Sequence, residues 1–215
     1  MQQKLISFDL QADFGVLKKP DVNEGLQMTF NILHKPALLG ILGAIAGLEG
    51  YKQKGQFPEY YLTLKDVPVG IEPLEGWHEK GNFGKTIIKY TNTVGYANKD
   101  GNLIITEQTL INPAYRCYLL LDLDKPVQAK LHQRVLAIES EYVPYIGKNE
   151  CTAWWETAEE HDFTIKQPDS VYNISSIFKK GDNIVKDNLE ESDDDFDMFE
   201  AVSYTHLTLP TIYSV

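Results

Sequence analysis

Residues 34–47 read His34-Lys-Pro-Ala-Leu-Leu-Gly-Ile-Leu-Gly-Ala-Ile-Ala-Gly47, and this stretch constrains the fold strongly. Pro36 suits the first position of a helix because its fixed φ matches helical backbone, so we expect a helix over residues 36–49. The helix is apolar almost all round, which predicts a buried position, yet it contains three glycines. Each glycine inside a helix costs about 1 kcal/mol relative to alanine. Something is therefore expected to pack very close to the helix backbone.

The segments on either side show strand and helix patterns in turn. Residues 4–10 alternate between apolar and polar side chains, which predicts a strand with one buried face. Residues 126–139 carry apolar side chains at helical spacing, which predicts an amphipathic helix on a sheet. The other expected elements are a loop at 11–27, an extended segment at 28–33, and strands at 60–74, 115–122 and 152–156.

A long β-hairpin is expected between these strands. Asn98-Lys-Asp-Gly101 is a strong turn signal between two strand-like runs, residues 86–96 and 102–108. Lysines and aromatic residues alternate here, and no Asp or Glu occurs between Lys80 and Lys99. Lysines reach phosphates and aromatic rings accept bases, so the hairpin suits single-stranded RNA. The alternative is a solvated hairpin whose lysines protect a strand edge, and the spacing leaves both interpretations open.

The order strand, helix, strand, hairpin, strand, helix, strand predicts an α+β fold. It corresponds to a ferredoxin-like βαββαβ pattern with an inserted long hairpin at about residues 75–108. Residues 1–186 are expected to form this single domain. Residues 187–200 form an acidic tail, and residues 201–215 resemble translated adaptor sequence, so we treat them as non-native or disordered.

The net charge of −11 is unevenly distributed. Eight acidic residues and no basic residue lie in residues 187–200, whereas residues 1–186 contain 20 basic and 23 acidic residues. The body is therefore close to neutral, and its charge does not exclude RNA binding. The chain contains two arginines, Arg116 and Arg134, so base reading in a duplex groove has few candidates.

Several other classes of protein are disfavoured. The N-terminus has no signal-peptide pattern, and the apolar stretch at 36–48 is shorter than the roughly 20 residues that span a bilayer. A cytoplasmic protein without membrane contact is expected, with Cys117 and Cys151 as free thiols. The five histidines are scattered, Gly84-Lys-Thr86 lacks the glycine that a phosphate loop needs at position 79, and no nucleophile elbow occurs. We expect no metal and no cofactor, and we assign no catalytic residue.

Metal-independent RNA cleavage is harder to exclude, because it needs only a base such as His or Tyr and a nearby Lys or Arg. His34 and Lys35 flank the start of the glycine-rich helix, where a phosphate is favoured. The alternative role of His34 is to cap the helix or to contact RNA without cleaving it. Lys130 and His132 lie two residues apart on a helix and do not face each other.

Three stretches carry a resemblance to a known family. They are Ser7-Phe-Asp-Leu10 with Ala12-Asp-Phe14, the glycine-rich residues 34–47, and Glu107-Gln-Thr-Leu-Ile-Asn-Pro113 leading to Tyr115-Arg-Cys-Tyr118. Over residues 4–165 the chain resembles the fifth Cas family, the small RAMP subunit of type I CRISPR Cascade complexes. The pattern is most similar to subtype I-B.

The resemblance implies a ferredoxin-like domain with a thumb-like hairpin that holds the 5′ handle of crRNA in antiviral interference. It also implies contact with the Cascade backbone subunit and large subunit, and with target DNA only through the assembled complex. Members of subtype I-C cut precursor crRNA, so the alternative is a metal-independent endoribonuclease. The residues expected to contact RNA are Lys18, Lys19, His34, Lys35, Gly40, Gly43, Lys80, Lys85, Lys89, Tyr90 and Arg116.

Overall fold

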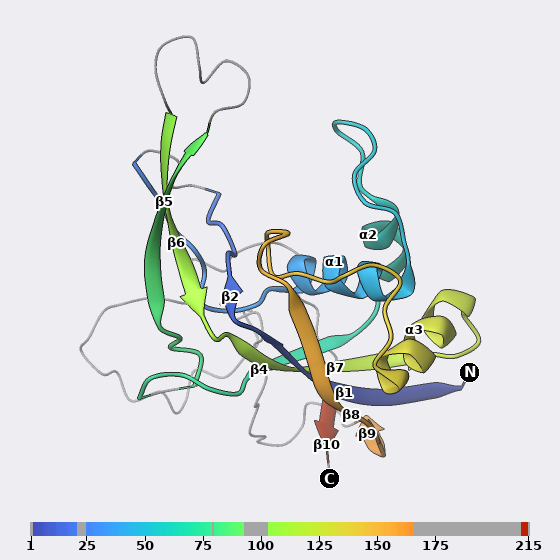
Figure 1. The fold of residues 1–215 in the computed structure, drawn as a ribbon. Helices are drawn as coiled ribbons and strands as arrows, with labels where there is room; N and C mark the ends of the chain where they lie inside the picture. Colours follow the sequence, from blue (N-terminus) through green and yellow to red (C-terminus); the bar gives the residue numbers. More distant parts are fainter. Residues whose placement is uncertain (1, 21–24, 79, 93–102, 166–211, 215) are drawn as a thin grey trace, which may run out of the picture.

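A computed structural model of the protein (Figure 1) describes residues 2–20, 25–78, 80–92, 103–165 and 212–214. The fold is a mixed α+β arrangement with two principal sheets. None of the helices in the described ranges is long and apolar enough to cross a membrane. The elements are β1 (Gln3–Ala12), β2 (Phe14–Gly15), β3 (Leu26–Gln27), α1 (Lys35–Ala46), α2 (Glu59–Leu64), β4 (Val69–Pro73), β5 (Lys85–Asn92), β6 (Leu103–Ile111), β7 (Ala114–Asp122), α3 (Pro126–Ala137), β8 (Ala153–His161), β9 (Phe163–Ile165) and β10 (Ile212–Ser214).

The first sheet has the strand order β4-β7-β1-β8, and all its neighbouring strands are antiparallel. The second sheet has the order β2-β6-β3, and β5 pairs with β6 as an antiparallel arm. Only the two-residue β3 runs parallel to β6 among these pairs. β9 and β10 pair separately. Figure 1 shows the β5–β6 arm extending away from the first sheet, while α1 and α3 lie against that sheet.

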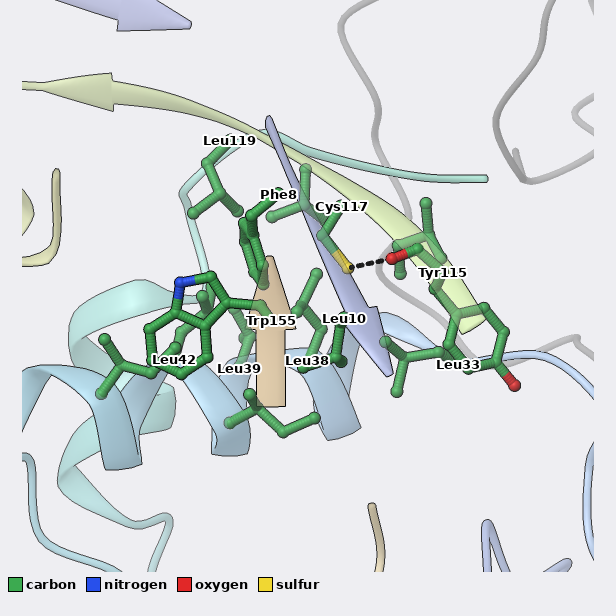
Figure 2. Close-up of a cluster of buried hydrophobic side chains, with 14 of the residues drawn as sticks. Phe8, Leu10, Leu33, Leu38, Leu39, Leu42, Tyr115, Cys117, Leu119 and Trp155 are labelled. Atoms are coloured by element: carbon green, nitrogen blue, oxygen red, sulfur yellow. Dashed lines mark hydrogen bonds between the residues drawn. The ribbon is translucent and has the colours of Figure 1, made fainter. Parts of the chain in front are cut away.

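The core lies between one face of the first sheet and α1. Phe8 of β1 and Trp155 of β8 meet edge to face with ring centroids 6.2 Å apart. Figure 2 shows these rings above Leu38, Leu39 and Leu42 of α1. All five side chains are buried, and each such side chain contributes about 2 kcal/mol of transfer free energy. Ile6, Phe8 and Leu10 of β1 belong to this core. The side chains that alternate with them, Leu5, Ser7 and Asp9, are also buried, so the prediction that only one face of this strand is buried is wrong.

Close packing on α1 is confirmed at Gly43. A Cβ at this position would lie 2.5 Å from the Cβ of Tyr60 in α2, whereas a Cβ at Gly40 would lie 3.9 Å from the Tyr60 ring. The partner that packs closely is thus a helix of the same chain. α1 ends at Gly47, whose φ of 78° is left-handed and whose N–H donates to Gly43 O.

The strand predicted at residues 60–74 is wrong in its first half. Residues 59–64 form α2, and only residues 69–73 form a strand, β4. Tyr60 and Leu64 lie on one side of both a strand and a helix because a spacing of four residues fits both periods. Packing of these two side chains beneath and beside α1 selects the helix. The segment expected to be extended at 28–33 is also not a regular strand, since β3 precedes it.

The other predicted elements are present with shifted ends. β1, β7, β8, α1 and α3 cover the predicted segments, and β8 continues to His161 past a bulge at Thr157. The two predicted hairpin strands pair as β5 and β6. The turn predicted at residues 98–101, the acidic tail and most of residues 201–215 lie outside the described residues.

Alanine substitutions in α1 test the close packing of Tyr60. Gly43→Ala is expected to lower the free energy of unfolding by about 1–3 kcal/mol, since its Cβ overlaps the base of a half-buried side chain. Gly40→Ala is the matched control and is expected to leave stability unchanged or raise it by up to about 1 kcal/mol through helix propensity. Chemical denaturation measures both. Equal effects at the two positions would contradict the packing argument.

Candidate nucleic-acid interface

Two of the predicted lysines meet at the base of the β5–β6 arm. Lys85 begins β5 opposite Leu110 of β6, and Lys19 lies close enough for its charge to act on Lys85. The Lys19 ammonium group also lies 5.3 Å from the centroid of the Phe30 ring. Backbone hydrogen bonds fix this arrangement, with Lys19 N donating to Met28 O and Phe30 N donating to Leu17 O. We call Lys19, Phe30 and Lys85 the lysine site.

The lysine site holds positive charge that the rest of the described chain does not neutralise. Lys85 is exposed overall, but partial desolvation of its ammonium group lowers its pKa, and the nearby charge of Lys19 lowers it further. Among the described residues, no carboxylate forms an ion pair with either lysine. Two like charges near each other, one of them over an aromatic ring, favour an anion that also has a flat apolar group, as a nucleotide does.

Tyr90 lies on the opposite face of the arm and has different partners. Glu107 of β6 is 4% exposed, and both of its carboxylate oxygens accept hydrogen bonds from Lys148. The Lys148 ammonium group also donates to Tyr90 Oη at 3.0 Å and lies 4.8 Å from the ring centroid. The net effect of these partners is a raised pKa for Lys148, although its desolvation acts in the opposite direction. Lys148 therefore stays charged and fixes Tyr90 against β6.

Lys148 belongs to the segment at residues 139–152, which we call the bridging loop. The loop starts on α1, where Glu141 N donates to Ile45 O. It then packs the fully buried Ile146 against the N-terminal segment, where Val16 N donates to Ile146 O. Figure 1 shows this segment running from α3 across α1 toward the arm. The bridging loop thus connects the helical layer to the hairpin.

His34 caps α1 instead of presenting a free imidazole. Its Nδ1 accepts the N–H of Ala37 at 3.2 Å, and its ring meets Phe30 edge to face with centroids 5.9 Å apart. Burial lowers the pKa of His34. This confirms the capping role, and the contact with Phe30 places His34 next to the lysine site.

The remaining predicted residues have other surroundings. Lys18 and Lys89 are exposed. Lys35 is buried and donates to Val67 O, while Gly40 and Gly43 face Tyr60. Lys80 pairs with Glu72 at 2.8 Å, and Arg116 makes two hydrogen bonds to Asp9 on β1. The residues with these internal partners, Lys35, Gly40, Gly43, Lys80 and Arg116, therefore do not belong to the lysine site.

Two residues of the interface were missed from the sequence, namely Phe30 and Lys148. The Phe30 ring is brought to Lys19 by backbone pairing of residues 17–19 with residues 28–30, two segments that carry no strong pattern. Lys148 lies 41 residues from Glu107. Its flanking sequence Gly147-Lys-Asn149 indicates an exposed turn and not a contact with a strand.

No group of metal-ligating side chains occurs within the described ranges. The free thiols of Cys117 and Cys151 are both buried, and burial raises their pKa values. The lysine site and the Tyr90–Lys148 contact therefore offer ammonium groups, a phenol hydroxyl group and aromatic rings for binding.

No family model matches the chain, and no curated protein matches it. Its structure is similar to a Cas protein (14% identity, 67% of this chain, 57% of that chain, TM-score 0.40). It is also similar to a chain of a CRISPR RNA-guided surveillance complex (12% identity, 67% of this chain, 58% of that chain, TM-score 0.45). A third similar structure is a CRISPR protein from Archaeoglobus fulgidus (12% identity, 75% of this chain, 65% of that chain, TM-score 0.36). The chain thus spans less than two thirds of the length of these proteins. At such identities and TM-scores, function has to be argued from the residues of this chain.

Removing Lys148 is expected to destabilise the attachment of the arm. Lys148→Met leaves the Glu107 carboxylate nearly buried without its cation, which is expected to cost about 2 kcal/mol of unfolding free energy. Lys148→Met combined with Glu107→Met removes both charges and is expected to recover most of that loss. Urea denaturation measures both variants. A double variant as unstable as the single one would show that the ion pair is not the source of the effect.

The cap on α1 predicts a pH dependence. Because the pKa of His34 lies below its ordinary value of 6.5 in the folded chain, the unfolded chain binds the proton more readily. Stability is therefore expected to be highest above about pH 6.5 and to fall as the pH is lowered toward the folded pKa. His34→Asn keeps a capping oxygen and removes the titration. Denaturation at a series of pH values between neutral and mildly acidic should show a smaller loss for His34→Asn than for the unmodified chain.

Proposed function

We propose that this protein is a non-catalytic RNA-binding subunit of a type I CRISPR Cascade complex, where it holds the 5′ handle of crRNA. The observation that carries the RNA-binding part is the lysine site, where Lys19 lies over the Phe30 ring and close enough to act on Lys85, and no described carboxylate pairs with either ammonium group. The assignment to a crRNA-guided complex is supported by the resemblance of residues 34–47 and 107–118 to the fifth Cas family, with subtype I-B the most similar pattern.

The strand order supports a ferredoxin-like domain. The first sheet contains four strands, which occur along the chain in the order β1, β4, β7 and β8. α1 and α2 lie between the first two of these strands, and α3 lies between the last two. In the sheet the strands are arranged in the order β4-β7-β1-β8. This is the arrangement of a βαββαβ unit. The β5–β6 arm interrupts the unit between β4 and β7, as expected for a thumb that reaches toward RNA.

The side chains favour function within an assembly. Both arginines of the chain make internal contacts, Arg116 with Asp9 and Arg134 with Ile45 O and Glu141. The chain therefore offers RNA point charges from lysines and no free bidentate guanidinium. We infer modest, salt-sensitive affinity in isolation and additional contacts from the backbone and large subunits of Cascade.

Neutralising the lysine site tests the proposal. Lys19→Gln with Lys85→Gln is expected to weaken binding of an oligouridylate of about 20 nucleotides roughly tenfold. The slope of log K against log salt is expected to become shallower by about 1.4, since two phosphate contacts are lost. Lys125→Gln with Lys130→Gln removes the same charge from exposed positions on the α3 side of the molecule and is the matched control. Fluorescence anisotropy over a salt series measures all three proteins.

Two results would contradict the proposal. Equal losses in the two double variants would show that general charge, and not the lysine site, holds RNA. Site-specific cutting of precursor repeat RNA in EDTA would show the alternative function, a metal-independent endoribonuclease. Binding of CRISPR repeat RNA without cutting, and more tightly than oligouridylate, is the expected result.

A further inference from the structure

Four tyrosines are distributed between the arm and the connection that joins α1 to α2. Tyr90 on β5 contacts Lys148, and Tyr145 lies three residues before Lys148 in the bridging loop. Tyr145 lies close enough to Tyr60 of α2 to influence its titration. Tyr60 meets Tyr51 edge to face, with ring centroids 6.4 Å apart and an interplanar angle of 82°.

We infer that these tyrosines, the tyrosine track, bind single-stranded RNA that leaves the lysine site. The inference rests on the proposed function and extends it to a second surface, formed by Tyr90, Tyr145, Tyr60 and Tyr51 with Lys148. β5 joins the two surfaces, because Lys85 and Lys89 point to one of its faces and Tyr90 to the other. Among the described strands β5 pairs with β6 alone, so its free edge gives RNA a short path from one face to the other.

The exposed rings of the track are available for bases. Tyr51 is 74% exposed and Tyr145 is 43% exposed, whereas Tyr60 is half-buried beneath them. The edge-to-face contact with Tyr60 supports the Tyr51 ring, which remains largely exposed. Bases of any identity stack on such faces, which suits a surface that follows the strand without reading its sequence.

The carboxylates that border the track are engaged within the chain, since Glu107 pairs with Lys148 and Glu49 pairs with Lys52. Residues 50–58 and 142–149 contain no Asp or Glu, but they contain Lys52, Lys54 and Lys148. Burial, together with the neighbouring Tyr51 and Tyr145, raises the pKa of Tyr60 to about 12, so its hydroxyl group remains a neutral donor. Lys52 pairs with Glu49, whereas no described carboxylate pairs with Lys54. This charge pattern favours RNA over an acidic protein partner.

The far end of the track is held in place by the fold. Glu49 N donates to Glu59 Oε2 at 2.8 Å, which ties the two ends of the connection between α1 and α2 together. Within the connection, Gln56 N donates to Gln53 O, and Gly55 adopts a left-handed φ of 84° that closes the turn. Figure 1 shows this connection projecting from the body on the same side as the β5–β6 arm. RNA bound at the lysine site can therefore reach it without passing around the molecule.

Paired substitutions on the full chain separate stacking from charge. Tyr51→Leu with Tyr145→Leu removes two exposed rings, and Tyr51→Phe with Tyr145→Phe keeps the rings and is the matched control. Trp77→Leu removes an exposed ring at a position outside the track. The probes are oligouridylates of about 8 and about 20 nucleotides, the shorter one being sufficient for the lysine site. Anisotropy at several salt concentrations gives affinity and salt slope.

The leucine pair is expected to weaken the longer oligomer at least about tenfold, with little change for the shorter one and an unchanged salt slope. The phenylalanine pair and Trp77→Leu are expected to bind both oligomers normally. Photo-crosslinking of a 4-thiouridine oligomer should label peptides from residues 50–58 and 142–149.

The control results distinguish the two proposals. Unchanged affinity of the leucine pair for the longer oligomer, while Lys19→Gln with Lys85→Gln still weakens it, would overturn the track and leave the lysine site intact. The exposed rings would then be assigned to a protein partner. Absence of binding by the unmodified chain to either oligomer would overturn the proposed function and the track together.

Discussion

The close approach of Gly147 to the N-terminal segment fixes the bridging loop, and the attachment of the arm and the tyrosine track depend on that loop. A Cβ at Gly147 would lie 1.7 Å from the carbonyl oxygen of Val16, and φ at this glycine is 83°. Any other residue would clash with backbone that cannot yield, so the loop is fixed where it crosses the N-terminal segment. Ile146, fully buried beside Gly15, fixes the same point from below. Lys148 is thereby aimed at Glu107, and Tyr145 is directed toward Tyr60.

The two surfaces differ in the physical interaction that they supply. In the proposed function, a phosphate bound at the lysine site would relieve the repulsion between its two ammonium groups, so that contribution would be electrostatic and fall with salt. The tyrosine track supplies ring faces and neutral hydroxyl groups, whose contribution depends little on salt. Near a surface such charges act over roughly 10 Å at physiological salt. The local excess of lysine at the arm therefore matters more than the net charge of the chain, most of which lies in residues 187–200.

Periodicity predicted those elements whose burial follows a single pattern. β1 alternates between the core and the opposite face, and α3 lays one apolar stripe on the sheet, so both were found from the sequence. α2 was not, because Tyr60 and Leu64 satisfy helix and strand spacing equally. Its conformation depends on packing against α1, where the absence of a side chain at Gly43 lets Tyr60 of α2 approach closely. The glycines of α1 indicated that approach correctly, but not which segment makes it.

The site was less predictable than the fold because charge pairing is a tertiary property. Lys80 and Arg116 have the residue types of an RNA surface, yet Glu72 and Asp9 neutralise them across strands. Lys85 has the same local sequence signal as Lys80, but no described carboxylate pairs with it, and the neighbour that the fold brings to it is another lysine. A lysine in a sequence is therefore only a candidate for an RNA contact. Whether it has a carboxylate partner depends on which side chain the fold places next to it. The same reasoning applies to the arginines, because both guanidinium groups donate to acceptors of the chain itself, so the proposed RNA binding rests on lysines that lack a described carboxylate partner.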